Sequence, residues 1–148
     1  MRTDEFVIRG QTISQGTEKL SFSGHKPGYA YRLTEFSLYP STNINGQNAE
    51  IAATITAGKT SIGATSPNFN DDSLIATAFL SHTPGHEEIT STHSVVNDTF
   101  LITQDLILTV RDSQNNPINW QCRFKPVKMS KAEDAVNNYK QFLISSSS

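Results

Sequence analysis

The stretch Ile118–Lys125, INWQCRFK, decides the fold, because its apolar and polar residues alternate without a break. Successive side chains of a β-strand point to opposite faces of the sheet, so Ile118, Trp120, Cys122 and Phe124 would share one face. The residues between them are polar or charged and would face water. The stretch therefore predicts a strand that covers a core on one side only.

The segment before this strand shows the same pattern. Leu106–Arg111 alternates in the same way, and the polar run Asp112–Pro117 separates it from Ile118. A strand, a polar loop and a second strand most simply predict a β-hairpin.

A third alternating stretch, Tyr29–Tyr39, changes phase near its middle. Tyr31 and Leu33 share one parity, whereas Phe36 and Leu38 share the other. One extra residue near Thr34 and Glu35 would bring both sets to the same face, so the pattern predicts a β-bulge. The alternative is a strand buried on both faces.

Eight short segments have strand-like composition or alternation, and turn-rich segments separate most of them. They are Phe6–Thr12, Glu18–Ser23, Tyr29–Tyr39, Ala49–Ala57, Leu74–His82, Asp98–Thr103, Leu106–Arg111 and Ile118–Val127. Strands at this spacing, without alternating helices, exclude an α/β fold and favour a sandwich or a barrel. We expect an all-β, antiparallel, jelly-roll-like β-sandwich over residues 1–129.

One amphipathic α-helix is predicted at residues 130–144, followed by a serine tail at 145–148. Ser130 and Glu133 form a capping box, and apolar residues follow at helical spacing. An isolated helix of this length is marginal in water, so its apolar side must be buried on its own domain or on a neighbour. The large side chains near its end are the candidate assembly interface: Tyr139, Phe142, Leu143 and Ile144.

Composition excludes several classes of function. The 148 residues carry a formal net charge of −2, and acids interrupt the densest basic run, from Arg111 to Lys131. Nucleic-acid binding needs clustered positive charge, so we expect none. No apolar run is long enough for a membrane-spanning helix, and Asp4 and Glu5 do not fit a signal peptide. The single cysteine, Cys122, cannot form an internal disulfide and is expected to be a buried, inert thiol.

The segment His82–His93, HTPGHEEITSTH, contains three of the four histidines and is the one stretch that suggests chemistry. Pro84 and Gly85 would break a helix, so His82 and His86 cannot present both rings on one helical face to a metal. A proline–glycine pair is turn chemistry, and a turn between strands is the preferred interpretation. We expect no metal, no cofactor and no catalytic residues here. An acidic loop, Asn68–Asp72, lacks the glutamate and glycine spacing of a calcium-binding loop.

The order of features resembles small β-sandwich virion structural proteins of bacteriophages, especially marine phages. The residues that carry the resemblance are Phe36–Pro40, Ile102–Leu106, Pro117–Phe124 and Met129–Glu133. It implies a non-enzymatic capsid, decoration or minor virion subunit, made in the host cytoplasm and located in the virion. Its partners would be copies of itself and other virion proteins.

Two other functions fit the sequence. A lectin-like, carbohydrate-binding β-sandwich would use exposed aromatic side chains such as Tyr29, Tyr31 or Phe69. A small metal-dependent enzyme would use the His82–His93 loop.

Overall fold

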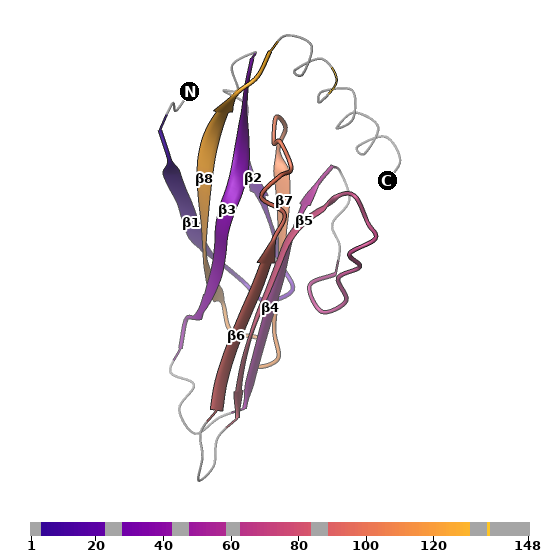
Figure 1. Cartoon of the computed structure of the whole chain (residues 1–148). Coiled ribbons are helices and arrows are strands. Elements are labelled where there is room, and N and C mark those ends of the chain that lie inside the picture. Colours follow the sequence, from indigo (N-terminus) through magenta and orange to yellow (C-terminus); the bar gives the residue numbers. More distant parts are fainter. Residues whose placement is uncertain are drawn as a thin grey trace.

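The computed structural model describes residues 4–22, 28–42, 48–58, 63–83, 89–130 and 136. Within them, eight strands form two antiparallel sheets that face each other as a β-sandwich (Figure 1). The strands are β1 (Phe6–Thr12), β2 (Thr17–Leu20), β3 (Tyr29–Pro40), β4 (Ala49–Ala57), β5 (Leu74–Thr83), β6 (Ile89–Val96), β7 (Leu106–Asp112) and β8 (Ile118–Lys128). One sheet has the order β1-β8-β3, and the other has the order β2-β7-β4-β5-β6. The predicted all-β, antiparallel sandwich is confirmed.

The stretch that predicted the fold is the central strand of the three-stranded sheet. β8 pairs with β1 on one side and with β3 on the other. The four apolar side chains that were expected to share a face are all buried: Ile118, Trp120, Cys122 and Phe124. The polar residues between them lie on the outer face, so the alternation describes the strand correctly.

The phase change in β3 is a β-bulge, as the sequence predicted. Leu33 pairs with Phe124 and Glu35 pairs with Arg123, which leaves Thr34 as the extra residue. The Thr34 hydroxyl donates a hydrogen bond to the carbonyl oxygen of Arg123 at 3.2 Å. Because of this extra residue, Leu33 and Phe36 are both buried in the core.

Phenylalanine rings fill one end of the core, and the indole of Trp120 fills another part of it. The Phe124 ring lies 5.5 Å from the Phe6 ring and 5.1 Å from the Phe22 ring, centroid to centroid. The indole Nε1–H of Trp120 donates a buried hydrogen bond to Thr12 Oγ1 at 2.9 Å. Aliphatic side chains of the five-stranded sheet complete the core, among them Ile51, Ile55, Ile75, Leu106, Leu108 and Val110.

The predicted hairpin between β7 and β8 is wrong. β7 lies in the five-stranded sheet and β8 lies in the three-stranded sheet, so the connection crosses from one sheet to the other. Alternation shows which face of a strand is buried, but both a hairpin and two facing strands satisfy it. The connection turns at Asp112, whose carboxylate accepts a hydrogen bond from the Gln114 amide, and at Asn115, whose φ is 58°.

The expected strand at Asp98–Thr103 is also wrong, and the strand that replaces it is β6. Asn97 Oδ1 accepts hydrogen bonds from the amide and the hydroxyl of Thr99, which closes a turn. Beyond this turn only Ile102 pairs, in an isolated bridge with Tyr31. The sequence did not predict β6 as a strand, because its serines and threonines show no apolar alternation. β6 is an edge strand of the five-stranded sheet.

Pro126 lies in β8 at a place where the strand needs no hydrogen bond from residue 126. Its partner in β3 is Tyr31, whose N–H and C=O point away from β8 and bond to Ile102 at 2.9 and 2.8 Å. The pair is therefore a non-hydrogen-bonded one, and the nitrogen of Pro126 faces the side of β1. β1 begins its pairing at Phe6, opposite Phe124. The proline thus lies just beyond the last pair between β1 and β8.

The predicted C-terminal helix and tail lie outside the described residues, apart from Ser130 and Val136. No helix among the described residues is long and apolar enough to cross a membrane.

Asp105 joins the end of β2 to the start of β7. One carboxylate oxygen accepts a hydrogen bond from the Phe22 amide at 2.7 Å, and the other lies 3.1 Å from Lys19 Nζ. Partial burial of the carboxyl raises its pKa, but the hydrogen bonds and the lysine charge outweigh burial. The net result is that the pKa of Asp105 lies below its ordinary value of 3.8.

We expect Asp105→Asn to lower the free energy of unfolding by about 1 kcal/mol at neutral pH, because the side chain is one-third exposed. A lowered pKa in the folded state adds stability above the ordinary pKa, and this is lost as pH falls through the folded-state pKa. The difference between wild type and variant should therefore be constant above about pH 5 and shrink below 3.8. Urea denaturation at a series of pH values measures it. A difference that grows toward acid pH would contradict the lowered pKa of Asp105 in the folded state.

Candidate functional site

The histidine-rich stretch connects β5 to β6, two neighbouring antiparallel strands. His82 is buried at the end of β5, and its Nδ1 lies 2.7 Å from Thr90 Oγ1. Its Nε2 is buried with no hydrogen-bond partner among the described residues. His93 lies on the opposite face of β6, stacked on Phe79 with the ring centroids 4.8 Å apart. Residues 84–88, including His86, lie outside the described residues.

The described part of the chain does not bring His82 and His93 together. His82 pairs with Thr90 on the core side of the sheet, whereas His93 pairs with Phe79 on the outer side. Among the described residues, no group of three or more histidine, cysteine, aspartate or glutamate side chains could hold a metal ion.

The acidic loop at residues 68–73 is stabilised by its own hydrogen bonds. Asp71 Oδ1 accepts hydrogen bonds from the amide and the hydroxyl of Ser73, and Asn68 Oδ1 accepts one from the Asn70 amide. The bonds from Ser73 lower the pKa of Asp71. These contacts are those of a tight turn.

The Cys122 thiol is fully buried in the core, and burial raises its pKa to about 12. At neutral pH the side chain is a thiol and not a thiolate, so it behaves as a small apolar residue. The predicted burial of Cys122 is confirmed by this placement.

The first of two distinctive surfaces is the open edge of β3. β3 is the edge strand of its sheet, and the one described partner on its outer side is Ile102, at the Tyr31 end. Past the bulge, the backbone groups of Phe36 and Leu38 point away from β8 toward this edge, because directions alternate along a strand. No described strand lies beside this half of β3.

The same opening leaves the inner face of β6 uncovered. Thr92 and Ser94 pair with the buried residues Leu80 and Ala78, so they lie on the core side of the sheet. They are nevertheless exposed, because the three-stranded sheet ends at β3. A cavity of about 170 Å³ lies between this half of β3 and the β5–β6 pair. We call the β3 edge together with this inner face the open edge.

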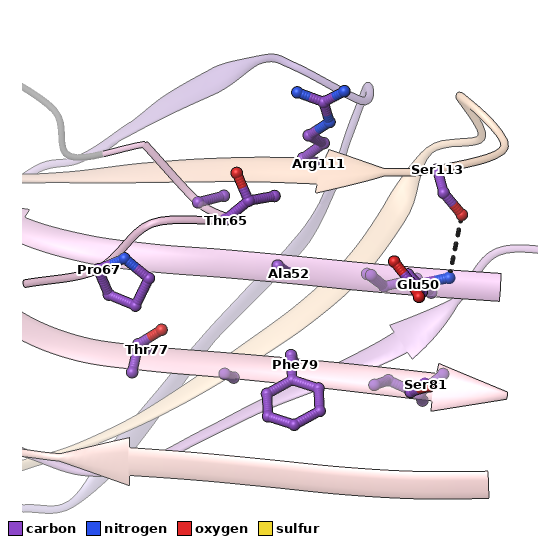
Figure 2. A pocket seen from close by; sticks show the side chains of 13 residues that line it. Glu50, Ala52, Thr65, Pro67, Thr77, Phe79, Ser81, Arg111 and Ser113 are labelled. Atoms are coloured by element: carbon purple, nitrogen blue, oxygen red, sulfur yellow. Dashed lines mark hydrogen bonds between the residues drawn. The ribbon is translucent and has the colours of Figure 1, made fainter. Parts of the chain in front are cut away.

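The second surface is a groove on the outer face of the five-stranded sheet, with a volume of about 670 Å³. Ala52 of β4 lies between Phe79 of β5 and Arg111 of β7, since both are its register partners (Figure 2). The small alanine side chain forms the floor between two larger ones. Figure 2 shows Glu50 on the same strand as Ala52, and the backbone N–H of Glu50 donates a hydrogen bond to Ser113 Oγ at 3.1 Å. We call this surface the outer groove.

One end of the outer groove is lined by the segment that carries Thr65 and Pro67, which crosses the strands in the view of Figure 2. Near this end, Thr54 lies on the outward-facing phase of β4 and is nevertheless fully buried. The groove is therefore bounded at one end and bordered on its two sides, as a ligand site requires.

The structure separates the other residues that the sequence singled out. Of the three aromatic candidates for lectin-like binding, Phe69 is exposed and Tyr29 is half-buried, but Tyr31 is 4% exposed and packs on Phe6 and Phe22. The choice of Tyr31 is wrong, because Tyr31 lies on the core face of β3 together with Leu33. The predicted assembly residues Tyr139, Phe142, Leu143 and Ile144 lie outside the described residues.

The densest basic run does not form one patch in the described residues. Arg111 belongs to β7, and Arg123 and Lys125 belong to the outer phase of β8. These strands are in different sheets, so their outward side chains point to opposite sides of the sandwich.

Sequence reasoning missed the outer groove, although one signal pointed to it. In β5, Phe79 falls on the polar phase among Thr77 and Ser81, where an exposed ring needs an explanation. The partners Ala52 and Arg111 could not be assigned without the strand order.

The chain matches no protein-family model, and no characterised protein in the comparison is significantly similar to it in sequence.

Proposed function

We propose that this chain is a non-enzymatic virion structural protein of a bacteriophage that joins a particle by strand addition at the open edge. The observation that carries the proposal is the half of β3 that pairs with no other described strand on its outer side and that faces the exposed inner face of β6. An exposed strand edge is a ready template for pairing with a strand of another chain.

The strand order supports a jelly-roll arrangement for this sandwich. Jelly rolls consist of eight strands in two sheets and are frequent in viral capsids. They order their strands as β1-β8-β3-β6 and β2-β7-β4-β5. Here all strands but β6 follow that order, and β6 remains paired with β5. In a jelly roll, the sixth strand lies beside the third. Among the described residues, only Ile102 pairs with β3 at this place, in its bridge to Tyr31. A strand from another subunit would complete the four-stranded sheet.

The expected partner strand is polar on one side. It would meet Thr92 and Ser94 of β6, whose hydroxyl groups need hydrogen-bond partners once they are covered. Its other contacts would be to the backbone of Phe36 and Leu38. The helix proposed for residues 130–144, with Tyr139, Phe142, Leu143 and Ile144, would supply a second contact with a neighbouring subunit or virion protein. The protein would then be found in the virion after synthesis in the host cytoplasm.

Thr92→Lys tests strand addition, because an inward-pointing charge opposes pairing at a sheet edge. The position is exposed, so the free energy of unfolding should change by less than about 0.5 kcal/mol. We expect the wild-type protein to form oligomers as concentration rises, or to bind particles, and Thr92→Lys to remain monomeric and unbound. Light scattering and particle co-sedimentation measure these outcomes.

The matched control is Ser91→Lys, which places the same charge on the other face of the same strand. It should assemble as wild type does. A wild-type protein that stays monomeric at high concentration and binds no particle would overturn the proposal. Equal assembly of Thr92→Lys and wild type would show that the open edge is not the contact.

A further inference from the structure

We propose that the outer groove binds a neutral saccharide, with one sugar ring lying against Phe79. This inference is independent of assembly at the open edge, because Phe79 and His93 lie on the outer face of β5 and β6, whereas Thr92 and Ser94 lie on the inner face.

Phe79 is the aromatic surface of the site. Its side chain is 47% exposed, which is unusual for so large an apolar group in a strand. His93 of β6 stacks on it with an interplanar angle of 27°, which fixes the ring orientation and occupies one face at most. A sugar ring presents a face of C–H groups that can pack on the exposed part of such a ring.

The polar groups of the site surround this aromatic surface. Arg111 offers only hydrogen-bond donors, Glu50 offers only acceptors when ionised, and the hydroxyl of Ser81 can do both. A sugar ring bears hydroxyl groups that donate and accept along its edge. The lining thus matches a ligand with an apolar face and a polar edge.

The charges of the site favour a neutral ligand. Ala52 pairs with Arg111, and Glu50 lies two residues from Ala52, so the two charged residues are diagonal neighbours. The ion pairs of the described residues join Lys19 to Asp105 and Arg123 to Glu35, so neither Glu50 nor Arg111 is used in them. Because the charges of Arg111 and Glu50 sum to zero, the site has no net attraction for an acidic sugar.

The size of the groove also fits. Its volume of about 670 Å³ falls within the range of small-molecule sites, roughly 300–1,000 Å³. The floor is kept low by the methyl group of Ala52, so a ring can approach the sheet between Phe79 and Arg111.

The test is a glycan array of neutral and acidic oligosaccharides, followed by amide NMR titration of the full chain. The titration uses the neutral trisaccharides of glucose, mannose and N-acetylglucosamine, and trigalacturonate as the acidic comparison. We expect at least one neutral sugar to shift the amides of Ala52, Phe79 and Arg111 saturably, and trigalacturonate to leave them in place.

Phe79→Ala should weaken this binding about tenfold or more, while Phe79→Trp should preserve it. Arg111→Gln should also weaken binding, since glutamine keeps a polar side chain but has two N–H donors where arginine has five. Tyr39→Ala is the matched control: Tyr39 is 72% exposed on β3, in the other sheet, so its removal should leave binding unchanged. The dispersion of the amide spectrum shows that each variant is folded.

The proposal is wrong if no sugar binds on the array and no sugar of the titration shifts the amides of Ala52, Phe79 and Arg111. It is equally wrong if only trigalacturonate binds, or if folded Phe79→Ala binds as tightly as wild type. Thr92→Lys should bind the sugar as wild type does, so a failure of assembly and a failure of sugar binding can be told apart.

Discussion

Trp120→Ala should lower the free energy of unfolding by about 3–5 kcal/mol, the cost of truncating a large aromatic side chain in a core. Trp120 is 5% exposed, and its indole donates a hydrogen bond to Thr12 Oγ1. The variant would leave a cavity on the core side of β8 and β1 and would also remove the donor to a buried hydroxyl. Urea denaturation followed by circular dichroism measures the loss without relying on the single tryptophan.

Tyr39→Ala is a suitable control for this experiment, because it removes an aromatic ring that is 72% exposed. It should change the free energy of unfolding by less than about 0.5 kcal/mol. If Trp120→Ala also changed the free energy of unfolding by less than about 0.5 kcal/mol, the buried face of β8 would have been assigned to the wrong side.

The second large effect is expected for Gly10→Val in β1. Gly10 is the register partner of Trp120, and a Cβ atom at position 10 would lie 2.9 Å from Cζ2 of the indole. The indole cannot move away freely, because its Nε1–H is bonded to Thr12. Overpacking of this kind costs about 1–3 kcal/mol, although valine alone is a better strand residue than glycine.

Gln11→Val is the matched control, since residue 11 is exposed on the other face of the same strand. It should cost far less than Gly10→Val. A double-mutant cycle gives a sharper result: in the Trp120→Ala background, Gly10→Val should be neutral or stabilising, because the obstructing ring is gone. Equal costs in both backgrounds would show that the glycine is not needed to accommodate the indole.

The sequence was informative where burial on one face controlled the choice of residues. β8 and β7 alternate because one face of each meets the core, and the bulge of β3 showed itself as a change of parity between Leu33 and Phe36. Such patterns depend only on neighbouring positions in one strand, so they can be predicted without knowledge of the fold.

The sequence was not informative where the partner of a strand mattered. Strand pairing joins residues that are distant in the chain, and the alternation of β7 and β8 is the same in a hairpin and across a sandwich. β6 lacked a signal because an edge strand with two wet faces has no apolar periodicity. The outer groove depends on three strands meeting in one register, which no local pattern contains.

Pro126 has a consequence for how the N-terminal strand finds its position. A slip of β1 by two residues along β8, so that a β1 residue paired with Pro126, would keep every side chain on its proper face. Alternation alone therefore does not forbid it. The slipped strand would face a ring nitrogen with no hydrogen to donate, and one ladder bond would be lost. Pro126 thus selects between two alignments that the apolar pattern treats as equal, because the native pairing from Phe6 to Thr12 keeps the hydrogen bond that the slipped pairing loses.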